Sequence, residues 1–214
     1  MSATPKTVTE LLARAGTTYA EQAGITLKDT PAPLFRLLVL AVLLSTRIRA
    51  DIAVDATREL VRSGMGTPRR MRVATWQQRV DALGRAHYSR DDESTATALG
   101  EGAELVLDRW KGDLRRLRDE SDADPAAVRT LLTEVPRLGP TGADIFCREA
   151  QAVWPQLRPA LDGKAAQGAR RLGLPEDPHE LAALVPADRV ARLAAALTRV
   201  ALEKGLAEEV LAAA

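Results

Sequence analysis

The sequence predicts an all-α protein, and three observations support this class. Ala, Leu, Arg and Glu dominate the composition, and these residues lose little rotamer freedom in helices. Aromatic residues make up only 3% of the 214 residues, and no segment shows the period of two that is typical of strands. Gly and Pro divide the chain into short segments whose apolar residues recur at helical spacing. We therefore expect about a dozen short helices and essentially no sheet.

The first two thirds of the chain contain most of the predicted helices. An amphipathic segment starts at Thr9 and runs towards Gly24, and the turn-rich sequence TLKDTPAP follows it. Pro33 begins a helix that is apolar nearly all round through Leu44, so we expect it at the centre of a bundle. Helical spacing and chain breaks then predict helices at about 50–61, 67–73, 75–83, 90–110 and 125–134.

The last third begins with the sequence PRLGPTG, which predicts a hairpin. A helix should follow it, run to Val153 and stop at the Trp-Pro dipeptide. Asp162 is expected to cap a helix over 163–172, which Gly173 closes. A short helix, a break at Pro186 and a long amphipathic helix complete the predicted bundle.

The charge balance limits the kinds of partner. The formal net charge is +1, from 30 basic and 29 acidic residues, so no overall field attracts the protein to nucleic acid. A nucleic-acid surface would need local segregation of charge. Such segregation occurs at Arg47 with Arg49, at Arg69, Arg70 and Arg72, and at Arg170 with Arg171. For any one of these clusters, a solvated helix face is the ordinary interpretation.

The single cysteine, Cys147, lies in the apolar sequence IFCREA, and we expect it to be a small buried hydrophobe. One cysteine excludes a cysteine-ligated metal or iron–sulfur site within the chain, so we expect no metal and no cofactor. The start MSATPKTVTE lacks the apolar core of a signal peptide, and the apolar run at 34–44 is too short to span a bilayer. We expect a soluble cytoplasmic protein without a membrane partner.

Two short stretches carry the chemistry. VPRLGPTGADIF, at 135–146, predicts a helix, a glycine hairpin and a second helix that starts near Gly142. Glycines permit the tight turn, and the N–H groups at a helix start favour a phosphate. PALDGKAAQGARRLG, at 159–173, places the carboxylate of Asp162 at the start of a further helix. Taken alone, the first stretch is also consistent with a common loop and Asp162 with a simple helix cap.

Five segments occur in a telling order: LLVLAVLLSTRIRADIAVDATREL, GRAHYSRDDESTATALGEGAEL, LLTEVPRLGPTGADIF, AVWPQLRPALDGKAAQGARRLGL and LVPADRVARLAAALTRVALEKG. The first resembles a buried helix ending in a Leu-Ser-x-Gln type sequence, and the second a Gly-x-Tyr-x-x-Lys-Ala loop. The third resembles a Leu-Pro-Gly-Val-Gly-Arg-Lys-Thr-Ala hairpin, the fourth a Trp-Pro and Val-Asp-Thr-His segment, and the fifth a Val-Pro helix. These are motifs of the endonuclease III family, in the helix-hairpin-helix and Gly-Pro-Asp superfamily of DNA glycosylases. The resemblance covers roughly residues 34–205, and five collinear motifs are more specific than any one of them.

The resemblance implies a two-lobed helical protein that bends duplex DNA, flips a damaged base into a cleft and cuts the N-glycosidic bond. One domain would span 33–152, with six helices and the helix-hairpin-helix at its end. The second would join 1–32 to 153–214 and carry Asp162. This residue falls on the family's catalytic aspartate, whose carboxylate stabilises an oxocarbenium-like sugar or activates water.

The same resemblance and the local charge predict the DNA contacts. The loop after the buried helix supplies a side chain that fills the hole left by the flipped base. Arg47 is the candidate for this wedge, with a phosphate contact as the alternative. His87 and Tyr88 are candidate cleft residues, with an exposed or packed His87 as the alternative. The predicted DNA-binding residues are Arg137, Leu138, Gly139, Pro140, Thr141, Gly142, Arg47, Arg49 and Lys164.

The chain departs from the family at several positions. Thr141 stands where glycosylase-lyases carry a nucleophilic lysine, and a threonine cannot form the Schiff base of β-elimination, so we expect no AP lyase activity. Lys164 is a conceivable amine, but its position on a helix favours solvent or a phosphate. Arg137 replaces the first hairpin glycine and either tightens the phosphate contact or spoils the hairpin geometry. The sequence GLAEEVLAAA follows where the family has its four-cysteine loop, so we expect no iron–sulfur cluster.

The sequence therefore predicts a monofunctional DNA glycosylase of base-excision repair without an iron–sulfur cluster. We expect a monomer that acts on double-stranded DNA, damaged or abasic, in the cytoplasm or at the nucleoid of a bacterium. One alternative is a non-catalytic helix-hairpin-helix protein that binds DNA but has lost excision activity. The other is a helical scaffold protein without a nucleic-acid role, which the near-zero net charge favours.

Overall fold

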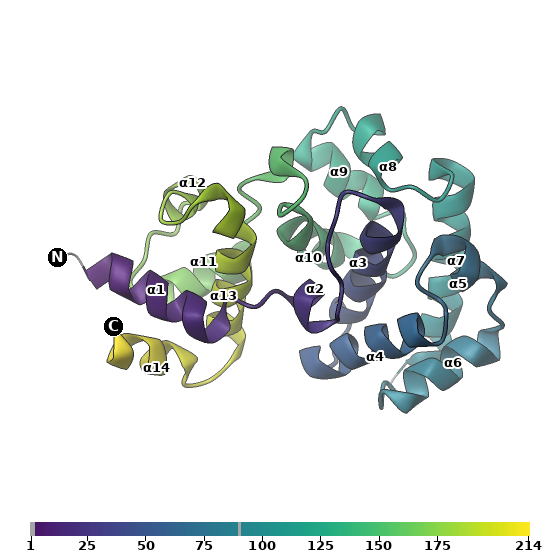
Figure 1. Ribbon diagram of the computed structural model, residues 1–214, viewed down its shortest axis with the longest axis horizontal. Coiled ribbons are helices and arrows are strands. Elements are labelled where there is room, and N and C mark those ends of the chain that lie inside the picture. The colour runs from purple at the N-terminus through teal and green to yellow at the C-terminus, as the bar shows by residue number, and fades with distance from the viewer. Residues whose placement is uncertain (1–2, 90) are drawn as a thin grey trace. The chain divides into compact units, whose positions relative to one another are not determined.

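The computed structural model describes residues 3–89 and 91–214, and these residues form a helical protein (Figure 1). Over them the chain makes fourteen α-helices and two short 3₁₀-helices and no strand, which confirms the predicted all-α class. None of these helices is long and apolar enough to cross a membrane.

The chain divides into two compact units, which we call the terminal and the central unit. The terminal unit joins the segment up to Tyr19 with Arg148–Ala214, and the central unit is Ala20–Cys147. The sequence analysis placed the boundaries after residues 32 and 152, so both lie earlier in the structure than expected. One reason is that residues 20–32 are bonded to central helices: a guanidinium N–H of Arg58 donates to the Gln22 carbonyl, and Arg118 pairs with Asp29 at 3.0 Å.

The central unit is built around one apolar helix, α3 (Pro31–Leu44), as predicted. Leu34, Leu37, Leu40 and Leu43 are all fully buried, as expected for a helix at the centre of a bundle. It packs on α4 (Ala50–Arg62). The other helices that lie wholly in this unit are α5 (Pro68–Val73), α6 (Trp76–Arg85), α7 (Asp92–Trp110), α8 (Arg115–Glu120) and α9 (Pro125–Leu132).

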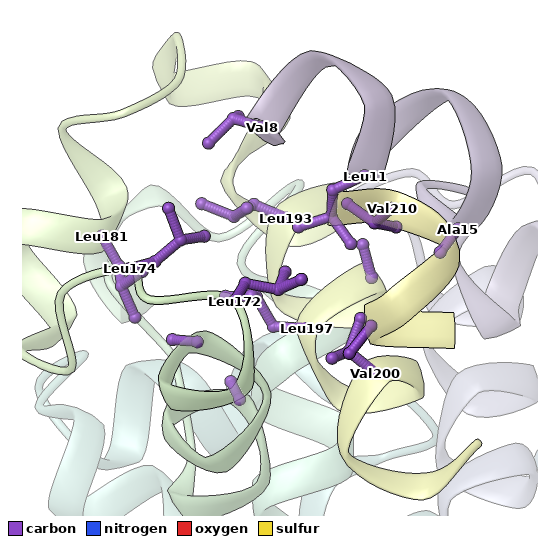
Figure 2. Close-up of a cluster of buried hydrophobic side chains, with 14 residues drawn as sticks. Val8, Leu11, Ala15, Leu172, Leu174, Leu181, Leu193, Leu197, Val200 and Val210 are labelled. Carbon is purple, nitrogen blue, oxygen red and sulfur yellow. The ribbon is translucent and has the colours of Figure 1, made fainter. Parts of the chain in front are cut away.

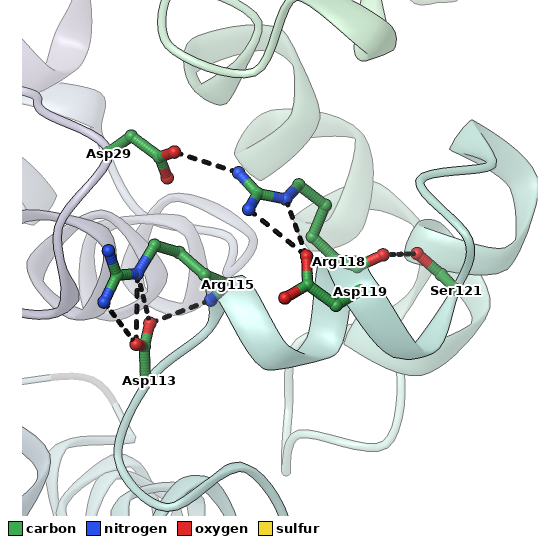
Figure 3. A network of polar contacts seen from close by, with 6 residues as sticks. All are labelled: Asp29, Asp113, Arg115, Arg118, Asp119 and Ser121. Atoms are coloured by element: carbon green, nitrogen blue, oxygen red, sulfur yellow. Dashed lines mark hydrogen bonds and ion pairs between the residues drawn. The ribbon is translucent and has the colours of Figure 1, made fainter.

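Helix α8 lies in a stretch for which the sequence analysis predicted no element. Its side chains are mostly charged, and only Leu117 is buried, so helical periodicity is weak. Ion pairs of the surrounding structure hold it (Figure 3). The Arg115 guanidinium forks onto Asp113 with its shortest contact at 2.6 Å, and Arg118 bonds both Asp29 and Asp119. The hydrogen bond from Arg115 holds the pKa of the Asp113 carboxyl below its usual value.

The terminal unit combines the first helix of the chain with its last third. The predicted single helix from Thr9 towards Gly24 is in fact two helices, because Gly16 and two β-branched threonines interrupt it. These two are α1 (Ala3–Ala15), which lies in the terminal unit, and α2 (Tyr19–Gln22), which lies in the central unit except for Tyr19. After α10 (Gly139–Ala150), the remaining elements are η1 (Pro155–Leu157), α11 (Gly163–Arg171), α12 (Pro178–Ala182), η2 (Ala187–Arg189), α13 (Val190–Leu202) and α14 (Leu206–Ala213).

Apolar side chains from distant parts of the sequence form the core of the terminal unit (Figure 2). Leu11 from α1, Leu193 and Leu197 from α13 and Val210 from α14 are fully buried in it. Helix α11 packs on α13 at Gly168, where an added Cβ would lie 1.9 Å from the Leu197 carbonyl oxygen. Only glycine permits so close a helix crossing, and this crossing fixes the helix that Asp162 caps.

Candidate functional site

The helix-hairpin-helix consists of α9, residues 133–138 and α10. Asp124 caps α9, as expected, by accepting a hydrogen bond from the Ala127 N–H at 2.7 Å. Helix α10 begins at Gly139, not near Gly142, where the sequence analysis placed its start. Pro140 is compatible with this earlier start because the first helical turn needs no N–H at that position.

The hairpin backbone keeps a left-handed conformation at two positions. Gly139 has a φ of +57°, and Arg137 has a φ of +63°. Arg137 stands where the resemblance has its first hairpin glycine, so the arginine adopts a glycine-like backbone and the turn is not spoiled. A side chain in this region costs roughly 1–2 kcal/mol.

The Arg137 side chain turns towards the start of α7. Its guanidinium donates to the hydroxyl of Ser94 and lies 3.8 Å from the Asp91 carboxylate. The side chain is 32% exposed, so this ion pair is a weak one in contact with solvent. The Asp91 carboxylate therefore partly neutralises the charge of Arg137, which weakens the attraction of this side chain for a phosphate.

Backbone donors at the start of α10 are fewer than the sequence suggested. Pro140 has no N–H, and the Gly142 N–H donates to the Leu138 carbonyl at 3.0 Å. Within the described residues, no acceptor binds the N–H groups of Gly139 and Thr141. The Leu138 side chain is only 1% exposed, so it packs the hairpin and presents no side chain to a ligand. Of the backbone N–H groups at the start of α10, those of Gly139 and Thr141 therefore remain free to bind a phosphate.

The loop after α3 contacts the hairpin directly. The Ser45 hydroxyl donates to the Val42 carbonyl at 2.7 Å and to the Arg137 carbonyl at 3.3 Å. An added Cβ on Gly142 would lie 2.8 Å from Cδ1 of Leu138 and 3.3 Å from the Cβ of Ser45, so the loop and the hairpin are in close contact at this glycine. The structure therefore brings the loop with Arg47 and Arg49 beside the hairpin.

The two arginines of this loop differ in their surroundings. Arg47 is exposed, and its guanidinium has no partner among the described residues. Arg49 forms a fork with the Asp51 carboxylate, with N–O distances of 3.0 and 2.5 Å, and this hydrogen bonding lowers the pKa of Asp51. Arg47 is thus the freer cation of the loop.

The two cleft candidates, which follow α6, differ in their exposure. Tyr88 is fully buried, and its hydroxyl is 2.9 Å from the Thr46 hydroxyl. The prediction that Tyr88 faces a cleft is therefore wrong, because its ring belongs to the core of the central unit and its polar atom joins two loops. His87 is exposed, with a left-handed φ of +58°.

Asp162 is the N-cap of α11, as predicted. Its Oδ1 accepts hydrogen bonds from the N–H groups of Lys164 at 2.9 Å and Ala165 at 3.0 Å. Its Oδ2 accepts a hydrogen bond from Nη1 of Arg148 at 2.9 Å. The side chain of Arg148 is 4% exposed and that of Asp162 is 14% exposed, so this ion pair is largely shielded from water. Arg148 was not among the site residues predicted from the sequence.

Gln151, which directly follows α10, also fixes the segment before Asp162. The Gln151 side chain accepts from the Ala160 N–H and donates to the Ala160 carbonyl, both at 2.9 Å. The Arg148 guanidinium lies 5.9 Å from the centre of the Tyr19 ring, and that of Arg199 lies 4.5 Å from the same ring. Burial raises the pKa of the Tyr19 hydroxyl. A sequence signal existed: Arg148 and Gln151 are polar residues three apart in the segment that was predicted as a helix through Val153, and in a helix this spacing places them on one face.

Neither Lys164 nor Cys147 lies in surroundings that activate its side chain. Lys164 is exposed, and its Nζ donates to Gln167 at 3.2 Å. Cys147 is fully buried, which confirms the expected small hydrophobe, and burial raises the pKa of its thiol to about 12. Among the described residues, no group of three His, Cys, Asp or Glu side chains is placed to hold a metal ion.

Comparisons with known proteins place the fold. No protein-family model matches the chain, and no curated protein matches its sequence. A solved structure does match: endonuclease III trapped as a covalent intermediate with DNA, in an estranged-adenine complex. The TM-score is 0.51 at 15% sequence identity, over 93% of this chain and 85% of that chain. The fold is endonuclease III-like. This likeness confirms the fold that the five collinear motifs implied.

Proposed function

We propose that this protein is a monofunctional DNA glycosylase of base-excision repair. It hydrolyses the N-glycosidic bond of a damaged or mismatched base that is flipped out of duplex DNA. The observation that carries this proposal is the largely shielded carboxylate of Asp162, which two backbone N–H groups and Arg148 hold at the start of α11 in an endonuclease III-like fold.

The hydrogen bonds of Asp162 leave room for the chemistry. A carboxylate has about four acceptor positions, and in this structure three of them are taken. The remaining position, on Oδ2, can accept the proton of an attacking water. As the base leaves with the electrons of the glycosidic bond, water adds to the sugar carbon, and the carboxylate stabilises the developing positive charge.

The DNA contacts of the proposal come from the hairpin and the loop after α3. The free N–H groups of Gly139 and Thr141 lie at a helix start, where the helix dipole favours a phosphate. Arg47 adds an unpaired cation on the loop that Ser45 bonds to the hairpin, and it acts as the wedge or as a further phosphate contact. The partner is double-stranded DNA, bound by a monomer.

The proposal includes neither lyase chemistry nor a cluster. Thr141, at the start of α10, carries a hydroxyl and no amine, so the hairpin cannot form the Schiff base that β-elimination requires. A four-thiolate iron–sulfur cluster does not fit these 214 residues, whose one cysteine is buried. No step of the reaction runs through such a group.

Base release is the direct test. Duplexes containing uracil, oxidised or alkylated bases are incubated with the protein, and free base is measured. We expect release from at least one lesion, and we expect Asp162→Asn to lower the rate by about 10²–10³-fold. Asp177 is a matched control, because it caps α12 in the same unit through the N–H groups of His179 and Glu180. Asp177→Asn should leave the rate unchanged.

A second candidate function is a DNA-binding protein without excision activity. One observation favours it: the Arg148 guanidinium offsets the charge of Asp162. Tight binding to duplexes with abasic-site analogues, weakening with salt but without base release, would establish this candidate. Absence of any salt-dependent duplex binding would eliminate both functions and leave the scaffold role.

A further inference from the structure

We propose that Arg148 is a positioning residue for base excision, which sets the plane of the Asp162 carboxylate. This inference rests on the proposed glycosylase function. It concerns the ion pair between Nη1 of Arg148 and Oδ2 of Asp162, 2.9 Å apart, which joins the end of α10 to the cap of α11.

The two oxygens of Asp162 are anchored by different groups. Oδ1 is fixed by the N–H groups of Lys164 and Ala165, and Oδ2 by Arg148 alone among the described residues. The last torsion of an aspartate side chain is broad, so one anchored oxygen leaves the carboxylate free to turn about it. The second anchor removes that freedom. Arg148 therefore decides in which direction the remaining acceptor position of Oδ2 points.

Arg148 is itself held in place, as a positioning residue must be. Its side chain is almost fully buried, and its guanidinium lies over the Tyr19 ring. Its carbonyl accepts a hydrogen bond from Gln151 at 2.8 Å, and the same Gln151 side chain binds Ala160. The hydrogen bond between Arg148 and Asp162 is thus made by two side chains that are both held in place.

A planar guanidinium suits this task better than an ammonium group. Its donors have fixed directions, and it stacks on an aromatic face, whereas a lysine carries a mobile point charge. We therefore expect R148K to keep the charge of the pair but not the orientation of the carboxylate. R148M removes both.

The test is a double-mutant cycle on single-turnover excision. The rate is measured for the wild type, R148M, D162N and the double variant, together with the affinity for an abasic-site duplex. R199M is the matched control, because Arg199 is also buried against Tyr19 but bonds the Ala15 carbonyl instead of Asp162. Circular dichroism and urea unfolding verify that each variant is folded.

We expect R148M to lower the single-turnover rate about 100-fold and to change the abasic-site affinity less than about threefold. In the D162N background R148M should cause no further loss, because Arg148 acts through that carboxylate. R199M should lose stability but keep the rate. A folded R148M with the wild-type rate, or an equal loss in the D162N background, would overturn the inference.

Two further outcomes are decisive. Removing one partner of a buried pair is costly, so R148M can fail to fold. R148K and R199K then carry the test, with an about tenfold loss expected for R148K alone; equal rates would overturn the inference. If the wild type releases no base from any lesion, the proposed function fails and this inference fails with it. Base release by the wild type with unchanged Arg148 variants refutes only the positioning role.

Discussion

The hydroxyl of Ser45 donates to the carbonyl of Arg137 at 3.3 Å, and this bond joins two segments that are 92 residues apart. One is the loop with the unpaired Arg47, and the other is the turn that leads into α10. The bond therefore connects the loop that carries this cation to the turn before the free N–H groups of Gly139 and Thr141. The predictions that concern DNA binding follow from this arrangement.

The left-handed backbone of Arg137 predicts an unusual order of stabilities. R137A and R137G both remove the contacts to Ser94 and Asp91, so their difference isolates the φ of +63°. We expect R137G to have the larger free energy of unfolding, by about 0.5–1 kcal/mol, measured with urea. Thr133 is exposed with a φ of −68°, so T133G should instead be less stable than T133A. The same order at both positions would contradict the strain at Arg137.

Arg47 should contribute to duplex binding through its charge. The logarithm of the binding constant falls linearly with the logarithm of salt concentration, and each phosphate contact adds roughly one to the slope. We expect R47A to reduce the slope by about one. Arg116 is also an exposed arginine, on α8, and R116A is the control. An unchanged slope for R47A would exclude a phosphate contact and leave only the wedge role.

Covalent trapping tests the absence of lyase activity. Because Thr141 offers no amine, borohydride should trap no adduct between the protein and a duplex with an abasic site. The assay reads the adduct as a band of reduced mobility on a denaturing gel. An adduct formed by the wild type and lost in K164A would show that Lys164 acts as the nucleophile, contrary to its contact with Gln167.

Cys147 should be unreactive in the folded protein. Only the thiolate reacts with a disulfide reagent, and burial raises the pKa of this thiol from 9.0 to about 12. At pH 8 we expect no modification in buffer and modification of one thiol per chain in denaturant. Fast reaction in buffer would contradict the burial.

The same thiol predicts a pH dependence of stability. The folded chain holds the Cys147 proton more tightly than the unfolded chain, so its contribution is fully present below pH 9.0 and is lost as the pH rises towards about 12. Urea unfolding between pH 8.5 and 10.5 should show a decline in the free energy of unfolding. C147A should reduce this decline; an identical decline in C147A would assign it to other groups.

Elements set by neighbouring residues could be predicted from the sequence. The apolar helix α3 follows from its composition, and the caps Asp124 and Asp162 follow from side chains that bond N–H groups three residues away or less. Helix α8 could not be predicted in this way. Its charged side chains lack periodicity, and its support from Asp29 comes from a segment 89 residues away in the chain.

The sequence identified candidate site residues but did not predict the contacts that surround them. Tyr88 lies in a polar segment and was predicted to face a cleft, but the surrounding core buries its ring. Arg137 stands where the resemblance has a glycine, which left open a tighter phosphate contact or a spoiled turn. In the structure its backbone is left-handed, and its side chain contacts Ser94 and Asp91. In both cases the deciding contacts come from other helices and loops.

Asp162 shows which contacts could be predicted from the sequence and which depend on the tertiary structure. Its place at the start of a helix was determined by the sequence Asp-Gly-Lys-Ala, because a capping bond closes within one helical turn. Its ion pair with Arg148 was decided only by the tertiary structure, since the path of residues 151–161 sets which side chain of α10 reaches Oδ2. Local hydrogen bonds can be inferred from a few neighbouring letters, whereas a buried charge pair depends on the packing of the whole unit.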